Sequence, residues 1–215
     1  MEKQDAINVL TEPGVIPVIR LNSGEKLPQL LEALQRGGIR AAELTMTIPG
    51  AAELLRENRR RFDGALLLGM GTITDRASAR AALEAGAEFL ISPFPVFEAL
   101  EEAQKAAVPM IAGAFSPYEV FQVSRAGADF VKVFPYNLCG PGYLKDLKGP
   151  LPGVKFFPTG GITLAEIPAL FKVAAGCGVG GALVRQELIR EERWRELSEL
   201  AAQFVAAAQE GRRGR

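Results

Sequence analysis

The sequence of 215 residues contains no histidine. Without an imidazole, the chain cannot build a Ser-His-Asp triad or a Cys-His pair, and it lacks the ligand on which most catalytic zinc sites depend. Any catalysis therefore has to use lysine, arginine, carboxylates, hydroxyl groups and backbone amides. We expect no metal ion and no other cofactor.

Several other features are scarce. The only two cysteines, Cys139 and Cys177, are too few for a disulfide framework and have no partners at metal-ligand spacing. The 25 lysines and arginines are balanced by 25 acidic residues, so no excess charge attracts nucleic acid or an anionic membrane. The apolar runs are far shorter than the roughly 18 residues of a membrane helix, and the first residues do not resemble a secretory signal. We expect a cytoplasmic protein that binds neither nucleic acid nor membrane.

What the sequence does contain is a regular alternation of short β-rich runs with longer helical segments, the pattern of a parallel sheet with crossover helices. The predicted strands cover residues 15–20, 42–47, 66–72, 88–93, 109–114, 130–134, 155–160 and 178–184. Eight strands with helices between them predict an α/β protein with a (β/α)8 (TIM) barrel. An open doubly wound sheet is the alternative, but no G-x-G-x-x-G turn follows the first predicted strand.

The predicted helices have recognisable ends. Ser116 and Thr163 each begin a capping box that is completed by Glu119 and Glu166, three residues later. A glycine follows each of four helical runs, as expected of a left-handed C-terminal cap: Gly38, Gly86, Gly127 and Gly176.

The two ends of the chain complete the predicted organisation. A short extra helix over 2–10 precedes the first strand, and a long amphipathic helix over 191–210 follows the last one. We expect a single barrel domain over 1–211 and a solvated basic tail over 212–215.

An internal repeat singles out Lys132. Segments 85–93 and 126–135 both run from Ala-Gly-Ala and an acidic residue into a strand, and Lys132 stands where the first copy has the apolar Ile91. Because side chains alternate along a strand, Lys132 and Phe134 share the face toward the barrel interior. Burial lowers the pKa of a lysine by roughly three to five units, and a neutral amine attacks carbonyl carbon. A lysine that only pairs with a carboxylate is the alternative.

The same alternation puts Glu43, Thr45 and Thr47 together on the inward face of the second strand. Desolvation would raise the pKa of Glu43 toward the range that a general acid/base needs at neutral pH. The alternative interpretation is a structural salt bridge between Glu43 and Lys132. Both stay open, because a lysine–glutamate pair is also the proton-transfer couple of an imine enzyme.

Further candidates lie at the carboxyl edge, where the active sites of barrels are built. Arg20 ends the first strand and Thr72 ends the third. An arginine there suits a substrate carboxylate, with a surface ion pair as the alternative. Thr159 ends the seventh strand, and the loops after strands seven and eight are the usual phosphate site of such barrels. Glycines whose backbone N–H groups can approach an anion occur at both positions: Gly160, Gly161, Gly180 and Gly181.

Together these motifs resemble the family of 2-keto-3-deoxy-6-phosphogluconate (KDPG) and 4-hydroxy-2-oxoglutarate (KHG) aldolases. The resemblance covers almost the whole chain, through segments 16–20, 43–49, 69–72, 91–93, 131–135, 158–161 and 179–184. It implies that Lys132 forms a Schiff base and that Glu43 is the acid/base. The substrate contacts that it implies are Arg20, Thr47, Thr72, Pro93, Phe134 and Thr159, with the phosphate held near Gly160, Gly161, Gly180 and Gly181. Some members have arginine at the position of Thr47, and others have serine at that of Gly181.

The resemblance further implies a class I, metal-independent aldolase that cleaves KDPG to pyruvate and D-glyceraldehyde 3-phosphate, assembled as a homotrimer. Cleavage of KHG to pyruvate and glyoxylate is a second possibility. A third is a phosphate-binding barrel without imine chemistry, in which Lys132 only neutralises Glu43, because one fold hosts many functions.

Overall fold

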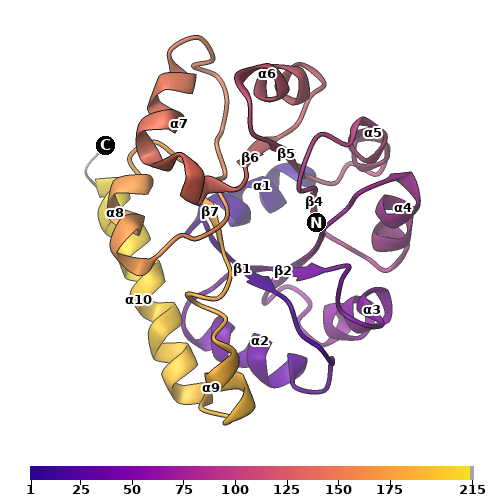
Figure 1. Ribbon diagram of the computed structural model, residues 1–215. Coiled ribbons are helices and arrows are strands. Elements are labelled where there is room, and N and C mark those ends of the chain that lie inside the picture. Colours follow the sequence, from indigo (N-terminus) through magenta and orange to yellow (C-terminus); the bar gives the residue numbers. More distant parts are fainter. Residues whose placement is uncertain (214–215) are drawn as a thin grey trace.

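The computed structural model describes residues 1–213 and has an α/β architecture around a curled parallel sheet (Figure 1). The seven strands are hydrogen-bonded in the order β6-β5-β4-β3-β2-β1-β7. Their bounds are β1 (Val15–Ile19), β2 (Ala41–Thr45), β3 (Leu67–Gly71), β4 (Leu90–Ile91), β5 (Met110–Ala114), β6 (Phe130–Val133) and β7 (Cys177–Val179). The α/β class and the parallel arrangement are as predicted.

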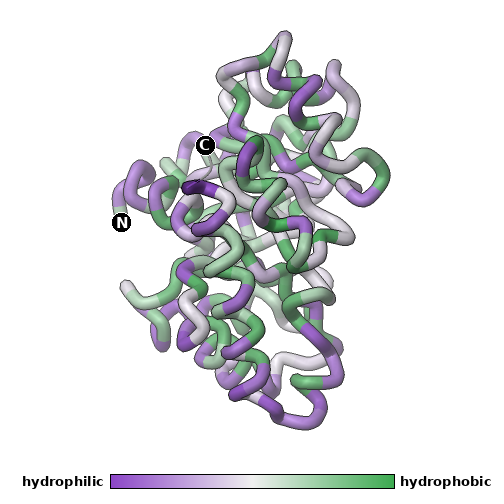
Figure 2. Tube along the Cα trace, turned by 90° about the vertical axis from the view of Figure 1, so that its left-hand side faces the viewer, coloured by the Kyte–Doolittle hydropathy of each residue, from purple (hydrophilic) through white to green (hydrophobic). Residues whose placement is uncertain are grey.

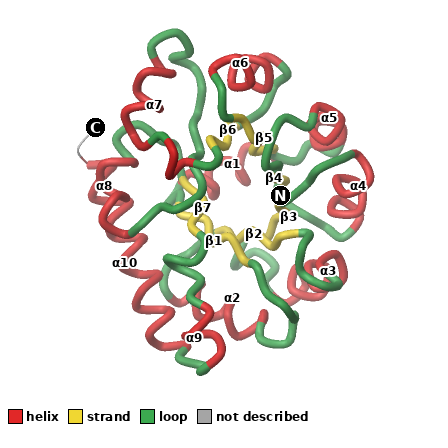
Figure 3. The backbone as a smooth tube through the Cα atoms, in the orientation of Figure 1, coloured by secondary structure: helices red, strands yellow, loops and turns green. Residues whose placement is uncertain are grey.

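Helices surround the sheet, as Figure 3 shows. The α-helices are α1 (Lys3–Thr11), α2 (Leu27–Arg36), α3 (Ala51–Arg61), α4 (Arg76–Glu84), α5 (Phe97–Lys105), α6 (Pro117–Arg125), α7 (Gly140–Lys148), α8 (Ile167–Leu170), α9 (Gln186–Arg190) and α10 (Trp194–Arg213). Two 3-10 helices, η1 (Tyr136–Leu138) and η2 (Leu164–Glu166), lie in the loops. None of the described helices is long and apolar enough to cross a membrane.

The seventh predicted strand, 155–160, does not form as a continuous strand. It makes one isolated parallel bridge to β6, between Val131 and Phe156, and another to β7, between Thr159 and Gly178. The hydrogen bonds to β6 continue past Pro158, from the Phe157 N–H to the Val131 carbonyl (2.8 Å) and from the Thr159 N–H to the Val133 carbonyl (3.0 Å), but Pro158 has no N–H to donate on the side of β7. Its carbonyl still accepts a hydrogen bond of 3.0 Å from the Gly178 N–H. The segment therefore lies between the two outermost strands of the sheet.

Other predicted boundaries also need correction. The strand predicted over 88–93 has only two residues, and that over 42–47 ends at Thr45, where the chain turns and the Ile48 N–H donates to the Thr45 carbonyl (3.0 Å). The last predicted strand, 178–184, begins one residue earlier and ends at Val179. Beyond it, the Leu183 N–H donates to the Gly180 carbonyl (2.9 Å) in a turn.

The capping predictions are largely confirmed. Ser116 and Glu119 form a reciprocal capping box at α6, whereas the box at Thr163 begins the 3-10 helix η2. Gly38, Gly86 and Gly127 have the predicted left-handed φ, between 88° and 92°. Gly176 does not: a Cβ there would lie 2.3 Å from the ring of Phe157, so this glycine is required by close packing.

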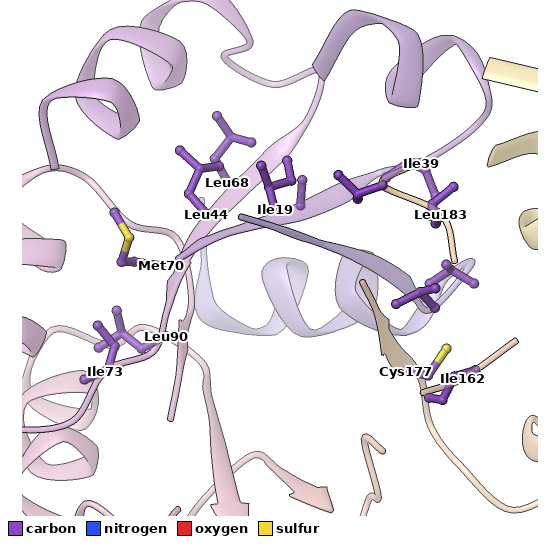
Figure 4. Close-up of a cluster of buried hydrophobic side chains, with 14 of the residues drawn as sticks. Ile19, Ile39, Leu44, Leu68, Met70, Ile73, Leu90, Ile162, Cys177 and Leu183 are labelled. Atoms are coloured by element: carbon purple, nitrogen blue, oxygen red, sulfur yellow. The ribbon is translucent and has the colours of Figure 1, made fainter. Parts of the chain in front are cut away.

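Two apolar layers pack on the strands. The outer layer fills the space between strands and helices, and Figure 4 shows Ile19, Leu44 and Leu68 among its residues. Along the outer helices hydrophobic and hydrophilic residues intermix, as Figure 2 shows, because each helix buries only one face. The outer layer thus fixes the helices around the sheet.

The inner layer fills the amino end of the curled sheet. It comprises strand residues, Phe89 just before β4, Phe157 of segment 155–160 and two residues of α1: Ile16, Ala41, Leu67, Phe89, Ile91, Ile111, Phe130, Phe157, Ala6 and Leu10. Helix α1 crosses the middle of the ring in Figure 1. The extra N-terminal helix that the sequence predicts is therefore present and closes this end.

The prediction of a solvated basic tail is wrong for its first residue. Helix α10 continues to Arg213, and the Arg212 guanidinium donates to the carbonyls of Ala175 (2.7 Å), Pro13 (3.3 Å) and Thr11. Arg212 therefore ties the last helix to the amino end of the sheet. Residues 214 and 215 of the predicted tail lie outside the described residues.

Candidate active site

The two residues predicted to carry the chemistry lie inside the curled sheet. Lys132 on β6 is 4% exposed and Glu43 on β2 is 1% exposed. Both oxygens of the Glu43 carboxylate are buried and have no hydrogen-bond partner. Among the described residues no direct ion pair joins Glu43 to Lys132. The structural salt bridge that the sequence left as an alternative is therefore absent.

The electrostatics of these two groups are coupled. Burial lowers the pKa of the Lys132 ammonium, an effect that the Glu43 carboxylate partly offsets and that the Arg20 guanidinium reinforces. Burial likewise raises the pKa of Glu43, while the positive charges of Lys132 and Arg20 act in the opposite direction. Desolvation dominates in both cases, which favours the neutral amine and the neutral acid.

The surroundings of the Lys132 amine are aromatic on one side and open on another. Its Nζ lies 5.2 Å from the centre of the Phe134 ring. In register with Lys132 on the neighbouring strand β5 is Gly113, which packs against the backbone of Pro93 and Phe94, and Lys132 also lines an open pocket. The amine is therefore held by packing and stays free to react.

A pocket of about 230 Å³ opens above Lys132. Eight of the predicted residues line it: Arg20, Lys132, Phe134, Thr159, Gly160, Gly161, Gly180 and Gly181. Four residues that were not predicted as site residues complete the lining: Val18, Ile162, Thr163 and Ala182. The alternation along β1 could have identified Val18, two positions before Arg20, whereas the other three lie in loops without a periodic signal.

Four predicted residues lie outside this lining: Glu43, Thr47, Pro93 and Thr72. Thr47 is exposed, accepts a hydrogen bond of 3.4 Å from the Arg20 guanidinium and shares one of 2.8 Å with the Thr45 hydroxyl. Because β2 ends at Thr45, the alternation that predicted an inward Thr47 does not extend to it. Pro93 follows β4, and its carbonyl would lie 2.6 Å from a Cβ at Gly113.

Thr72, the last of these four residues, directly follows β3 and has a left-handed φ of 61°. For a β-branched residue this conformation is strained, at a cost of about 1–3 kcal/mol, and such strain is concentrated at functional sites. The surrounding structure therefore holds Thr72 in one orientation at the carboxyl edge.

The four glycines of the pocket differ in their backbone. Gly160 and Gly161 have left-handed φ values of 106° and 72°, which side-chain-bearing residues rarely adopt. Gly180 and Gly181 do not, and a Cβ at either would meet no heavy atom within 4 Å. The second pair therefore faces open space.

The cysteines have ordinary surroundings. Cys177 is fully buried, which raises the pKa of its thiol, and the Cys139 thiol donates to the Tyr136 carbonyl over 3.3 Å. Over residues 1–213 there is no group of three or more histidine, cysteine, aspartate or glutamate side chains that could hold a metal ion.

Fold and site together define an α/β protein with a lysine-centred pocket at the carboxyl edge of a curled parallel sheet. The chain belongs to the KDPG and KHG aldolase family, whose model matches residues 6–200. Aldolases of this family are carbon–carbon lyases.

Individual relatives agree over nearly the whole chain. The 2-dehydro-3-deoxy-phosphogluconate aldolase of Treponema pallidum is 35% identical over 195 residues, covering 89% of this chain and 91% of that protein. The enzyme of the same name from Pseudomonas aeruginosa is 30% identical over 205 residues, covering 94% and 92%. The KDPG aldolase of Legionella pneumophila, with pyruvate captured as a covalent carbinolamine intermediate, has a TM-score of 0.85 at 33% identity, covering 92% of this chain and 96% of that one.

Proposed function

We propose that this protein is a class I aldolase that cleaves KDPG to pyruvate and D-glyceraldehyde 3-phosphate through a Schiff base on Lys132. The observation that carries the proposal is the buried amine of Lys132, with a depressed pKa, at the floor of the pocket. The carbinolamine of the Legionella relative supports it, because such an adduct requires an amine that attacks pyruvate.

The cleavage follows from these groups. The Lys132 amine attacks the C2 ketone, and the carbinolamine loses water to give a protonated imine. Glu43, directly or through water, removes the proton of the C4 hydroxyl. The C3–C4 bond breaks, its electron pair moves into the imine, and the aldehyde leaves. The enamine is then protonated at C3, and hydrolysis of the imine releases pyruvate and regenerates Lys132.

We assign the remaining residues by their chemistry. The Arg20 guanidinium, at the rim of the pocket, binds the substrate carboxylate with parallel hydrogen bonds. Thr47, Thr72, Pro93, Phe134 and Thr159 contact the substrate between Arg20 and the phosphate end. The phosphoryl group binds the backbone N–H groups of Gly160, Gly161, Gly180 and Gly181, since two of these glycines face open space in the pocket.

KHG is the second candidate substrate. The family description includes it, and the same Lys132 chemistry would yield pyruvate and glyoxylate. This chain has no arginine at position 47 and no serine at position 181, so only backbone amides are proposed to bind the phosphate. The preference for a phosphorylated substrate should therefore be weaker than in a pocket where a charged side chain binds the phosphate. Measuring kcat/KM for KDPG and for KHG with one enzyme preparation shows which substrate is preferred.

We also propose that the chain is a single domain over 1–211 whose seven strands are closed by segment 155–160 into an eight-stranded barrel. The bridges of this segment to β6 and to β7 support closure. The two free cysteines fit a reducing cytoplasm.

A homotrimer is the third part of the proposal. Six large apolar side chains in and after the loops that follow β4, β5 and β6 are 38–70% exposed, and we call them the aromatic patch: Phe94, Phe97, Phe115, Tyr118, Phe121 and Leu138. With about 200 Å² for each side chain, the patch exposes roughly 600 Å², close to the ~800 Å² that each partner buries in a standard interface. A second copy of the chain would cover it. Phe121→Glu should yield monomers in sedimentation, and an unchanged assembly would refute this surface.

Borohydride reduction in the presence of pyruvate tests the Schiff base. We expect one stable adduct per chain, at Lys132 by mass spectrometry, and no adduct in Lys132→Arg, because a guanidinium stays protonated. Lys155→Arg is the matched control: the Lys155 amine also lies over a phenylalanine ring, at 5.8 Å from the centre of Phe130, but is exposed. No label would leave the barrel without imine chemistry as the better description, and a label on another lysine would refute the role of Lys132.

A further inference from the structure

The Glu43 side chain lies across the neighbouring strand β3 at a position without a side chain. In the β2–β3 register Glu43 pairs with Gly69, and Thr45 pairs with Gly71. A Cβ built on Gly71 would lie 1.7 Å from Glu43 Oε1, 2.4 Å from Cδ and 2.6 Å from Cγ. An alanine at position 71 is therefore incompatible with the observed conformation of Glu43.

The backbone does not explain why this residue is glycine. Gly71 is the last residue of β3 and does not have a left-handed φ, so its conformation is open to any residue. The three atoms nearest to its virtual Cβ all belong to Glu43. At Gly69, two positions earlier on the same face, the three nearest atoms all belong to the ring of Phe89. The first glycine makes room for core packing, and the second makes room for a carboxylate.

No polar contact within the described residues holds the Glu43 carboxylate where it lies. Both oxygens lack a hydrogen-bond partner, although the side chain is 1% exposed. Its position is therefore set by the shape of the cavity around it, and the absent side chain of Gly71 is one wall of that cavity. A single methyl group would change this wall.

We propose that Gly71 is a positioning residue, which keeps open the niche on β3 in which the Glu43 carboxylate must lie to exchange protons with the substrate bound to Lys132. The inference rests on the proposed function for its catalytic consequence. Its steric part rests on the geometry of β2 and β3 alone.

The catalytic test is Gly71→Ala, with Gly69→Ala as the matched control on the same strand. A displaced acid/base should lower kcat by about 10- to 100-fold, part of the roughly 10²- to 10⁴-fold contribution of a general acid/base. KM should change by less than about twofold, because Arg20 and the pocket glycines are untouched, and the final extent of borohydride labelling at Lys132 should be retained. The Glu43-dependent limb of the pH–rate profile should shift in Gly71→Ala only. Unchanged kcat and pH profile in Gly71→Ala, or the same shift in both variants, would overturn the proposal.

The steric test does not depend on activity. Thermal unfolding is compared for Gly71→Ala in two backgrounds, wild type and Glu43→Ala. We expect the alanine at position 71 to lower the Tm in the wild-type background and to have little effect where the Glu43 side chain has been removed. An equal loss in both backgrounds would mean that the methyl group disturbs the strand and not Glu43, which would refute the niche. If the wild type neither cleaves KDPG nor is labelled at Lys132, the proposed function fails, and this thermal cycle still decides the steric claim.

Discussion

Replacing Gly181 by valine tests the phosphate end of the pocket. The residue has no left-handed φ and a Cβ there meets no heavy atom within 4 Å, so the fold accommodates the new side chain, which enters open space beside the pocket. A hydrogen bond to a charged group contributes about 1.5–3 kcal/mol. Loss of one such bond to the phosphoryl group should lower kcat/KM for KDPG by about 10- to 100-fold relative to an unphosphorylated keto acid.

The assay is the ratio of kcat/KM for KDPG to that for KHG, before and after the substitution. Gly142→Val is the matched control, because Gly142 also has open space and no left-handed φ but lies on α7, outside the pocket. Pyruvate labelling of Lys132 should survive in both variants, and inorganic phosphate should compete with KDPG less well in Gly181→Val. An unchanged ratio would refute the phosphate site and favour KHG as the main substrate.

The choice of Gly181 depends on the structure. From the sequence alone, Gly161→Val is an equally natural test. Gly161 has a φ of 72°, and a Cβ there would lie 2.6 Å from the Cβ of Asn137. A valine would therefore strain the backbone and move a neighbour, and lost activity would not separate phosphate binding from chain geometry.

Three further predictions concern charge. Glu43→Gln should lower the rate by roughly 10²- to 10⁴-fold, measured as steady-state cleavage, and full activity would show that another group moves the proton. Because burial lowers the pKa of Lys132 below the ordinary 10.5, the rate of pyruvate labelling should rise with pH and level off below pH 10.5; a rise that continues beyond it would contradict this pKa. Hydrogen bonds from Arg80, Lys105 and Arg76 lower the pKa of Glu102 to about 2, so its contribution to stability is present above pH 4.5 and is lost as the pH falls toward 2. Glu102→Gln should therefore lower the Tm at pH 7 but not at pH 2, and an equal loss at both values would refute it.

Strand periodicity accounts for what the sequence predicted well. The alternation along β6 and β2 correctly put Lys132 and Glu43 inside the sheet, because side-chain direction in a strand depends only on parity. The repeat around Lys132 also has a structural counterpart. Glu88 accepts from the Leu68 N–H and Asp129 from the Met110 N–H, each over 2.9 Å, so the acidic residue of each copy joins its strand to the preceding one.

The wrong predictions concern residues outside regular strands, where the alternation of side chains no longer applies. Thr47 lies beyond the end of β2, and Pro158 removes a hydrogen-bond donor from segment 155–160 on the side of β7; the alternation carries no information about either feature. The sequence predicts Arg212 to be a tail residue, because its three carbonyl partners come from parts of the chain that only the fold brings together. The sequence does not distinguish Gly71 from the other glycines, because its role depends on the position of the Glu43 side chain.

The closure of the amino end by α1 has a consequence for the order in which substrates bind and products leave. Ala6 and Leu10 of this helix pack into the inner apolar layer, so in the described part of the chain the pocket that contains Lys132 opens at the carboxyl edge. Under the proposed mechanism, the aldehyde fragment lies between the opening and the pyruvate that is bound to Lys132. Pyruvate can then depart only after the aldehyde has gone, and in the reverse direction pyruvate has to enter first. A curled sheet that is closed at one end would, under this mechanism, impose an ordered kinetic sequence without any moving lid.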